Sequence, residues 1–122
     1  MDDQKRKGIR LRDLRKANRL TQEKLAELTE LSKDALSKME RGESNPSTES
    51  LERIARVYRM KLYELLAYID DPDDSPRAQA IRDILAMCRR LDDLSLELVR
   101  RQVTAVDDLA RAVTPTHSAG GR

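Results

Sequence analysis

The sequence has few aromatic residues, a single cysteine and no long apolar run. Its 122 residues contain three tyrosines, no Phe and no Trp, so any hydrophobic core must be built from aliphatic side chains. Cys88 is the only cysteine, which excludes an intrachain disulfide and a zinc site made of cysteines. No stretch reaches the ~20 apolar residues that span a bilayer, and the first ten residues lack the apolar segment of a secretion signal. These absences predict a cytoplasmic protein.

The formal net charge of +2 is too small to identify a partner, but its distribution is uneven. Residues 1–66 hold 16 Lys+Arg against 12 Asp+Glu, a balance of +4, whereas residues 67–122 hold 8 against 10, a balance of −2. Such an excess is also within the range of an ordinary protein surface. Charge alone therefore does not decide whether the first half binds nucleic acid.

Apolar residues recur at helical spacing through most of the chain, and no alternating pattern of strand length is present. This predicts an all-α fold, with five short helices in residues 1–68. Thr21, Ser32 and Ser47 or Thr48 are good N-caps for the second, third and fourth of these helices. Asn45 and Pro46 mark a loop before the fourth helix.

The second half of the chain predicts a different arrangement. Residues 70–75 are acidic, contain Pro72 and lack apolar anchors, so we expect an exposed linker and a domain boundary at residues 69–75. Residues 76–113 then predict two helices that form a hairpin, and residues 114–122 predict a disordered tail.

Two short helices joined by a tight turn are typical of a helix-turn-helix DNA-binding unit. Residues 9–66 resemble the Cro/phage-repressor family, also called the xenobiotic-response-element type of helix-turn-helix domain. The matching positions are Leu11, Leu14, Arg15, Leu20, Thr21, Gln22, Leu25, Ala26, the segment 36–42, the segment 45–47, Leu51, Ile54 and Ala55. One departure is Glu30, because the family often has Gly at this turn, so either Glu30 is left-handed or the turn differs locally.

The resemblance implies that the third helix, about residues 32–41, enters the major groove of double-stranded DNA. The expected base-reading residues are Ser32, Lys33, Asp34, Ser37 and Lys38. Lysine can donate to guanine O6 and N7, aspartate can accept from cytosine N4, and serine can do either. Asp34 has an alternative role, since a carboxylate in the first helical turn also stabilises the helix dipole.

The resemblance also implies contacts that position the protein without reading bases. The expected phosphate-contacting residues are Thr21, Gln22, Arg41, Ser44 and Asn45. Arg15 and Glu40 match a pair that joins the first helix to the third in the family, and they are expected to form a structural ion pair.

The two C-terminal helices each present one apolar stripe, and two isolated helices can bury little surface. We therefore expect two hairpins to pair as a homodimer, with self as a protein partner alongside DNA. The expected dimerisation residues are Ile81, Ile84, Leu85, Cys88, Leu91, Leu96, Val99, Val103, Val106 and Val113. Cys88 lies on this stripe, which favours an interior position over a redox sensor. Docking of the hairpin onto its own N-terminal domain or onto another protein is the alternative.

The sequence thus predicts a dimeric, sequence-specific transcription regulator, a repressor or an activator, on a pseudo-palindromic operator. An antitoxin or restriction-controller autoregulator would use the same domain, and a protein-interaction adaptor that reads no bases is a second class. Enzymatic activity, metal and cofactors are not expected, because no glycine-rich phosphate loop is present and His117 is the only histidine. Single-stranded nucleic acid is disfavoured by the shortage of aromatic side chains. A small-molecule effector is not predicted by any feature.

Overall fold

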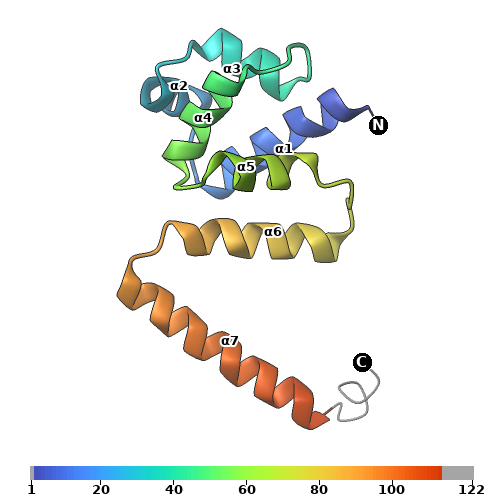
Figure 1. Cartoon of the computed structure of the whole chain (residues 1–122), viewed down its shortest axis with the longest axis vertical. Helices are drawn as coiled ribbons and strands as arrows, with labels where there is room; N and C mark the ends of the chain where they lie inside the picture. Colours follow the sequence, from blue (N-terminus) through green and yellow to red (C-terminus); the bar gives the residue numbers. More distant parts are fainter. Residues whose placement is uncertain (1, 114–122) are drawn as a thin grey trace. The chain divides into compact units, whose positions relative to one another are not determined.

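A computed structural model describes residues 2–113 of the chain. Over this range the protein consists of seven α-helices and contains no β-strand, which confirms the all-α prediction (Figure 1). The helices are α1 (Asp3–Ala17), α2 (Gln22–Thr29), α3 (Lys33–Glu40), α4 (Thr48–Val57), α5 (Leu62–Asp70), α6 (Pro76–Arg89) and α7 (Asp93–Val113). None of the helices in this range combines the length and apolar character needed to cross a membrane. The predicted tail at residues 114–122, with His117, lies outside the described residues.

Helix starts follow the capping signals of the sequence. The hydroxyls of Thr21, Ser32, Ser47 and Ser75 accept hydrogen bonds from backbone N–H groups in the first turns of α2, α3, α4 and α6. Helix α1 begins earlier than its first apolar residue, Ile9, because the Asp2 carboxylate accepts a hydrogen bond from the Lys5 amide at 2.8 Å. An apolar pattern cannot reveal this additional polar turn.

Helices α1 to α5 enclose one aliphatic core. The side chains of Leu14, Leu65 and Ile69 are completely buried, and two tyrosines, Tyr58 and Tyr68, complete the interior. In Figure 1, α2, α3 and α4 lie together at one end of this unit, and α1 and α5 lie alongside each other. The core thus fixes the positions of α2 and α3, the helices of the predicted DNA-binding unit.

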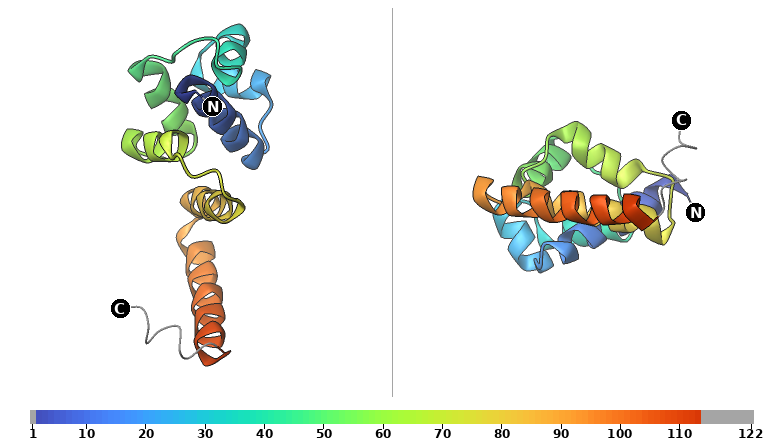
Figure 2. Two further views of the ribbon diagram at one scale, coloured as in Figure 1. Left: turned by 90° about the vertical axis from the view of Figure 1, so that its right-hand side faces the viewer. Right: turned by 90° about the horizontal axis from the view of Figure 1, so that it is seen from below.

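The chain divides into two compact units, the first ending at Arg90 and the second beginning at Leu91. The expected boundary at residues 69–75 is therefore corrected. Asp70 is the last residue of α5, and α6 packs on α1 with Ala86 buried in the common core. In the left view of Figure 2, α6 is the gold helix that follows the short segment after α5.

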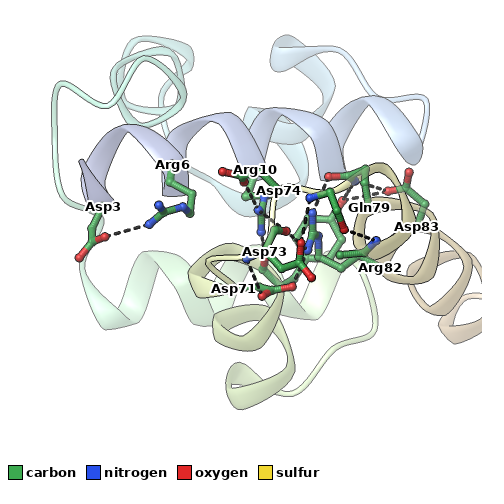
Figure 3. A network of polar contacts seen from close by, with 12 residues as sticks. Asp3, Arg6, Arg10, Asp71, Asp73, Asp74, Gln79, Arg82 and Asp83 are labelled. Carbon is green, nitrogen blue, oxygen red and sulfur yellow. Dashed lines mark hydrogen bonds and ion pairs between the residues drawn. The ribbon is translucent and has the colours of Figure 1, made fainter. Parts of the chain in front are cut away.

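The acidic segment is largely exposed, as predicted, but arginine side chains tie it to the first unit, so it is not a free linker (Figure 3). Arg10 donates to the Tyr68 and Asp73 carbonyls and to the Asp74 carboxylate, and Arg82 donates to the Asp71 carboxylate. The sequence predicted a free spacer because the partners of these acidic residues cannot be seen locally. Asp74 pairs with Arg10, 64 residues earlier on α1, and Asp71 pairs with Arg82 on α6. Composition cannot show such distant pairing.

The second unit contains α7, a single uninterrupted helix of 21 residues with no buried residue. Its apolar side chains Leu96, Val103, Val106 and Val113 are all exposed. The arrangement of α6 and α7 as a hairpin stays a prediction.

Candidate nucleic-acid interface

The α2–turn–α3 unit has the local features that the sequence predicted. Thr21 Oγ1 accepts from the Lys24 amide and Ser32 Oγ accepts from the Ala35 amide, both at 3.0 Å. Between the helices, Glu30 adopts φ 61° and ψ 23°, the left-handed conformation that favours glycine. Glu30 is therefore left-handed, the first of the two alternatives that the resemblance left open at this turn.

Helix α3 has one buried face and one polar face. Leu36 and Met39 are buried in the core. Of the expected base-reading residues, Ser32, Lys33, Asp34 and Lys38 are exposed, and Ser37 is partly buried. Because the helix is anchored by its apolar side chains, the polar side chains project from a rigid support.

Each cation of this polar face is paired with an acid. Lys33 Nζ lies 2.8 Å from Glu23 Oε2 on α2, and Lys38 Nζ lies 3.2 Å from Asp34 Oδ2. The hydrogen bond from Lys33 lowers the pKa of Glu23. Such exposed pairs contribute little stability, so a nucleic acid can replace them at small cost.

The residues expected to contact phosphate lie at the start of α2 and directly after the end of α3. Asn45 is exposed and Ser44 partly exposed in the loop between α3 and α4. Arg41 hydrogen-bonds Ser37 and forms an ion pair with Glu43 at 2.8 Å, and the hydrogen bond from Arg41 lowers the pKa of Glu43. Thr21 Oγ1 accepts the capping hydrogen bond of α2, which leaves its O–H as a donor for a phosphate oxygen.

A buried polar cluster joins α1, α2 and α3. Arg15 Nε and Nη2 donate to the two carboxylate oxygens of Glu40 at 2.7 and 2.9 Å, so the expected ion pair is present and bidentate. Gln22 Nε2 donates to Glu40 Oε1 at 3.0 Å. The hydrogen bond to Glu40 raises the pKa of Arg15, which keeps the guanidinium charged although the pair is mostly buried. Glu40 therefore also orients the side chain that is expected to touch a phosphate.

Sequence reasoning missed Gly8, which sets the distance between α1 and the end of α3. A Cβ at Gly8 would lie 2.6 Å from the carbonyl oxygens of Met39 and Glu40. Gln4 Nε2 strengthens this contact by donating to the Gly42 carbonyl at 2.7 Å. A glycine within an otherwise helical segment was the one available signal, since such a residue commonly marks close backbone approach.

Comparison with known proteins identifies the first unit. Residues 8–67 match the family model described as "Helix-turn-helix domain", so this part of the chain is a helix-turn-helix domain. This match confirms the resemblance to the Cro/phage-repressor type. A comparison with curated proteins gives no match.

A solved structure with a similar fold is the clp gene regulator ClgR from Corynebacterium glutamicum. The two chains are 23% identical, the similarity covers 96% of each, and the TM-score is 0.50. The fold likeness extends over almost the entire chain and thus includes helices beyond the matched domain.

Proposed function

We propose that the protein is a sequence-specific double-stranded DNA-binding transcription regulator, with α3 in the major groove. The observation that carries this proposal is the exposed polar face of α3, presented by a helix-turn-helix unit whose opposite face is buried. Lys33 and Lys38 supply donors for guanine, Asp34 an acceptor for cytosine, and Ser32 and Ser37 adaptable hydroxyls. This inventory can read a short half-site.

Thr21, Gln22, Arg41, Ser44 and Asn45 hold the domain on the sugar-phosphate backbone. Gln22 lies at the first residue of α2, where backbone N–H groups and the helix dipole favour an anion. One amide hydrogen of Gln22 serves Glu40, which leaves the second for a phosphate oxygen. Such contacts fix register and orientation and carry no sequence information.

The regulator acts as a homodimer on a pseudo-palindromic operator. Ile81, Ile84 and Leu85 on α6 remain half exposed, and α7 buries none of its apolar side chains, so both helices have surface that a second copy can cover. The remaining members of the dimerisation set are Cys88, Leu91, Leu96, Val99, Val103, Val106 and Val113. Two-fold pairing places two α3 helices in successive major grooves, about 34 Å apart.

A repressor in the cytoplasm, without enzymatic activity, is the simplest form of this function. The solved structure with a similar fold is that of a gene regulator, which supports regulation as the role. An antitoxin or restriction-controller autoregulator uses the same geometry. An adaptor that reads no bases differs from these regulators in showing no sequence-selective binding to a duplex.

The test compares two duplexes: one recovered by selection from a random library (the selected duplex) and one with the same bases in scrambled order. Each is titrated with the full chain at several salt concentrations. We expect Lys33→Ala and Lys38→Ala to weaken binding to the selected duplex by about 1–3 kcal/mol each and to relax the preference at one base pair. Gln22→Ala should weaken binding to both duplexes by a similar factor. Arg111→Ala on α7, which removes one exposed charge outside the proposed interface, is the control.

Equal loss on the selected and scrambled duplexes for both lysine variants would reassign them to phosphate contacts. Binding that does not depend on salt or sequence in the unaltered chain would favour the adaptor.

A further inference from the structure

Helix α6 has two faces with different chemistry. Ala86 is the only apolar residue of this helix that is buried, and Arg82 is buried beside it. Ile81, Ile84 and Leu85, on the other side, are 48%, 49% and 50% exposed. The helix therefore docks on its own domain through very little apolar surface and keeps an aliphatic stripe for another contact.

Arg10 of α1 fastens the start of α6 through the preceding segment (Figure 3). Its guanidinium donates to the Tyr68 carbonyl at 3.0 Å, the Asp73 carbonyl at 3.2 Å and the Asp74 carboxylate at 2.6 Å. The Arg10 side chain is only 3% exposed. One planar cation thus ties the end of α5 and the following turn to α1.

Arg82 fastens the same segment from the α6 side. It donates to the Asp73 carbonyl at 2.9 Å and to the Asp71 carboxylate, and its guanidinium lies 6.0 Å from the centre of the Tyr68 ring. Tyr68 in turn donates from its hydroxyl to Asp83 at 3.1 Å. The forked geometry of both guanidinium groups fixes angle as well as distance.

Two further arginines hold the other end of the helix. Arg89 Nε donates to Glu64 Oε2 on α5 at 2.9 Å, and Arg90 Nη1 donates to Asn18 Oδ1 after α1 at 2.6 Å. The side chains of Arg10 and Arg82 are buried, whereas those of Arg89 and Arg90 are partly exposed. The rigid part of the attachment is therefore at the start of α6.

We propose that Arg10 and Arg82 are positioning residues that determine the half-site spacing the protein accepts. This inference rests on the proposed function. The stripe of Ile81, Ile84 and Leu85 belongs to the same compact unit as α3, so a second copy seated on the stripe inherits a fixed relation to both α3 helices. Without the two guanidinium groups, α6 keeps one buried alanine, the hydrogen bonds from Tyr68 to Asp83 and from Arg90 to Asn18, and the ion pair of Arg89 with Glu64, and its axis can pivot while the dimer stays intact.

The experiment uses duplexes in which the two half-sites are moved together or apart by one or two base pairs. Each inserted pair shifts a half-site by about 3.4 Å and rotates it by about 34°. We expect the full chain to lose about tenfold or more in affinity per inserted pair. Arg10→Met and Arg82→Met should reduce that penalty to about threefold or less, while affinity for a duplex with one half-site stays within about twofold.

Arg101→Met is the matched control, since it makes the same substitution in an exposed pair with Glu97 on α7 and should keep the full spacing penalty. If substitution of a buried arginine prevents folding, the double variant Asp71→Asn and Asp74→Asn replaces it, because it removes the carboxylate partners of Arg82 and Arg10 at the surface. A folded, dimeric variant that retains the full penalty overturns the proposal, as does one whose single half-site affinity falls in parallel. An unaltered chain that selects no duplex instead overturns the proposed function.

A measurement without DNA tests the positioning role of Arg82 separately from the proposed DNA-binding function. Spin labels at Lys24→Cys in a chain carrying Cys88→Ala report the distance between the two α2 helices of the dimer. We expect a narrow distribution that widens on addition of Arg82→Met, and an unchanged width contradicts a positioning role for Arg82.

Discussion

Glu40 receives three hydrogen bonds on one carboxylate, two from Arg15 and one from Gln22. A buried ion pair adds little compared with well-packed apolar residues, but the loss of one partner leaves an uncompensated charge. The cluster therefore specifies the register of α1 against α3, and it also links the stability of the fold to the orientation of a phosphate-contacting amide.

Single removal of either ionic partner should be costly, and double removal should not be additive. We expect Arg15→Ala and Glu40→Ala each to lower the free energy of unfolding by about 3–5 kcal/mol, with the double variant losing clearly less than the sum. Chemical denaturation of the four proteins measures this coupling. Strict additivity would mean that the two residues do not interact in solution.

Gly8 offers a second test at the level of one residue. Gly8→Ala places a methyl group against the backbone carbonyls of Met39 and Glu40, and backbone atoms there can yield only if α1 and α3 separate. We expect a loss of about 1–3 kcal/mol of stability, despite the higher helix propensity of alanine. Unchanged or higher stability in a thermal melt would show that α1 and α3 are not in close contact at this point.

Among the individual helices, capping residues and apolar spacing were sufficient to predict α2, α3 and α4. They were insufficient where the backbone takes an uncommon conformation. Arg19, Glu30 and Arg59 all have positive φ, yet none of them is a glycine or an asparagine. The chain tolerates these conformations because the helices on both sides of each turn are fixed by the shared core, which is a tertiary effect that local sequence does not encode.

Glycine at position 30, in the turn between α2 and α3, should therefore stabilise the fold. Glu30→Gly removes the Cβ that disfavours the left-handed conformation, and we expect stability to rise by about 1 kcal/mol with no change of fold. Glu52→Gly, at an exposed position in the middle of α4, is the matching control and should lower stability by about 1 kcal/mol. A Glu30→Gly protein that melts at a lower temperature would contradict the left-handed turn.

The segment between α5 and α6 shows the same limit of sequence reasoning. Residues 71–75 are solvated, as their composition indicates, but Arg10 and Arg82 also bind them, so the connection between the two helices is held in place. A charge run can be assigned to solvent or to partners only when the distant residues that face it are known. The exposed polar face of α3, in contrast, could be predicted because its register follows from Leu36 and Met39 alone.

For the molecule as a whole, the exposed stripes of α6 and α7 require an explanation. We expect the full chain to be a dimer at micromolar concentration, and Val103→Asp to convert it to a monomer by placing a charge in the apolar contact. Thr104→Asp adds the same charge on the neighbouring position off the stripe and should leave the dimer intact. Light scattering or sedimentation distinguishes the two states.

A truncated chain would test dimerisation less clearly than the Val103→Asp variant. Ending the chain at Tyr68 removes Ile69 and Ala86 from the core of the first unit, so any loss of association would be mixed with loss of stability. A monomeric full chain, or a Val103→Asp protein that remains dimeric, would show that the α7 stripe does not join two copies.

In the proposed complex, two copies of α3 read one symmetric stretch of duplex. Selection of bound duplexes from a random library by the full chain is the decisive experiment, because the recovered sequences give bases, symmetry and spacing together. We predict a pseudo-palindrome whose half-sites are centred about 10 base pairs apart, with guanines at positions that lose their preference in Lys33→Ala and Lys38→Ala. A library that emerges without any enriched sequence, or with one whose preferences are unchanged in both lysine variants, would show that α3 does not read the duplex in this way.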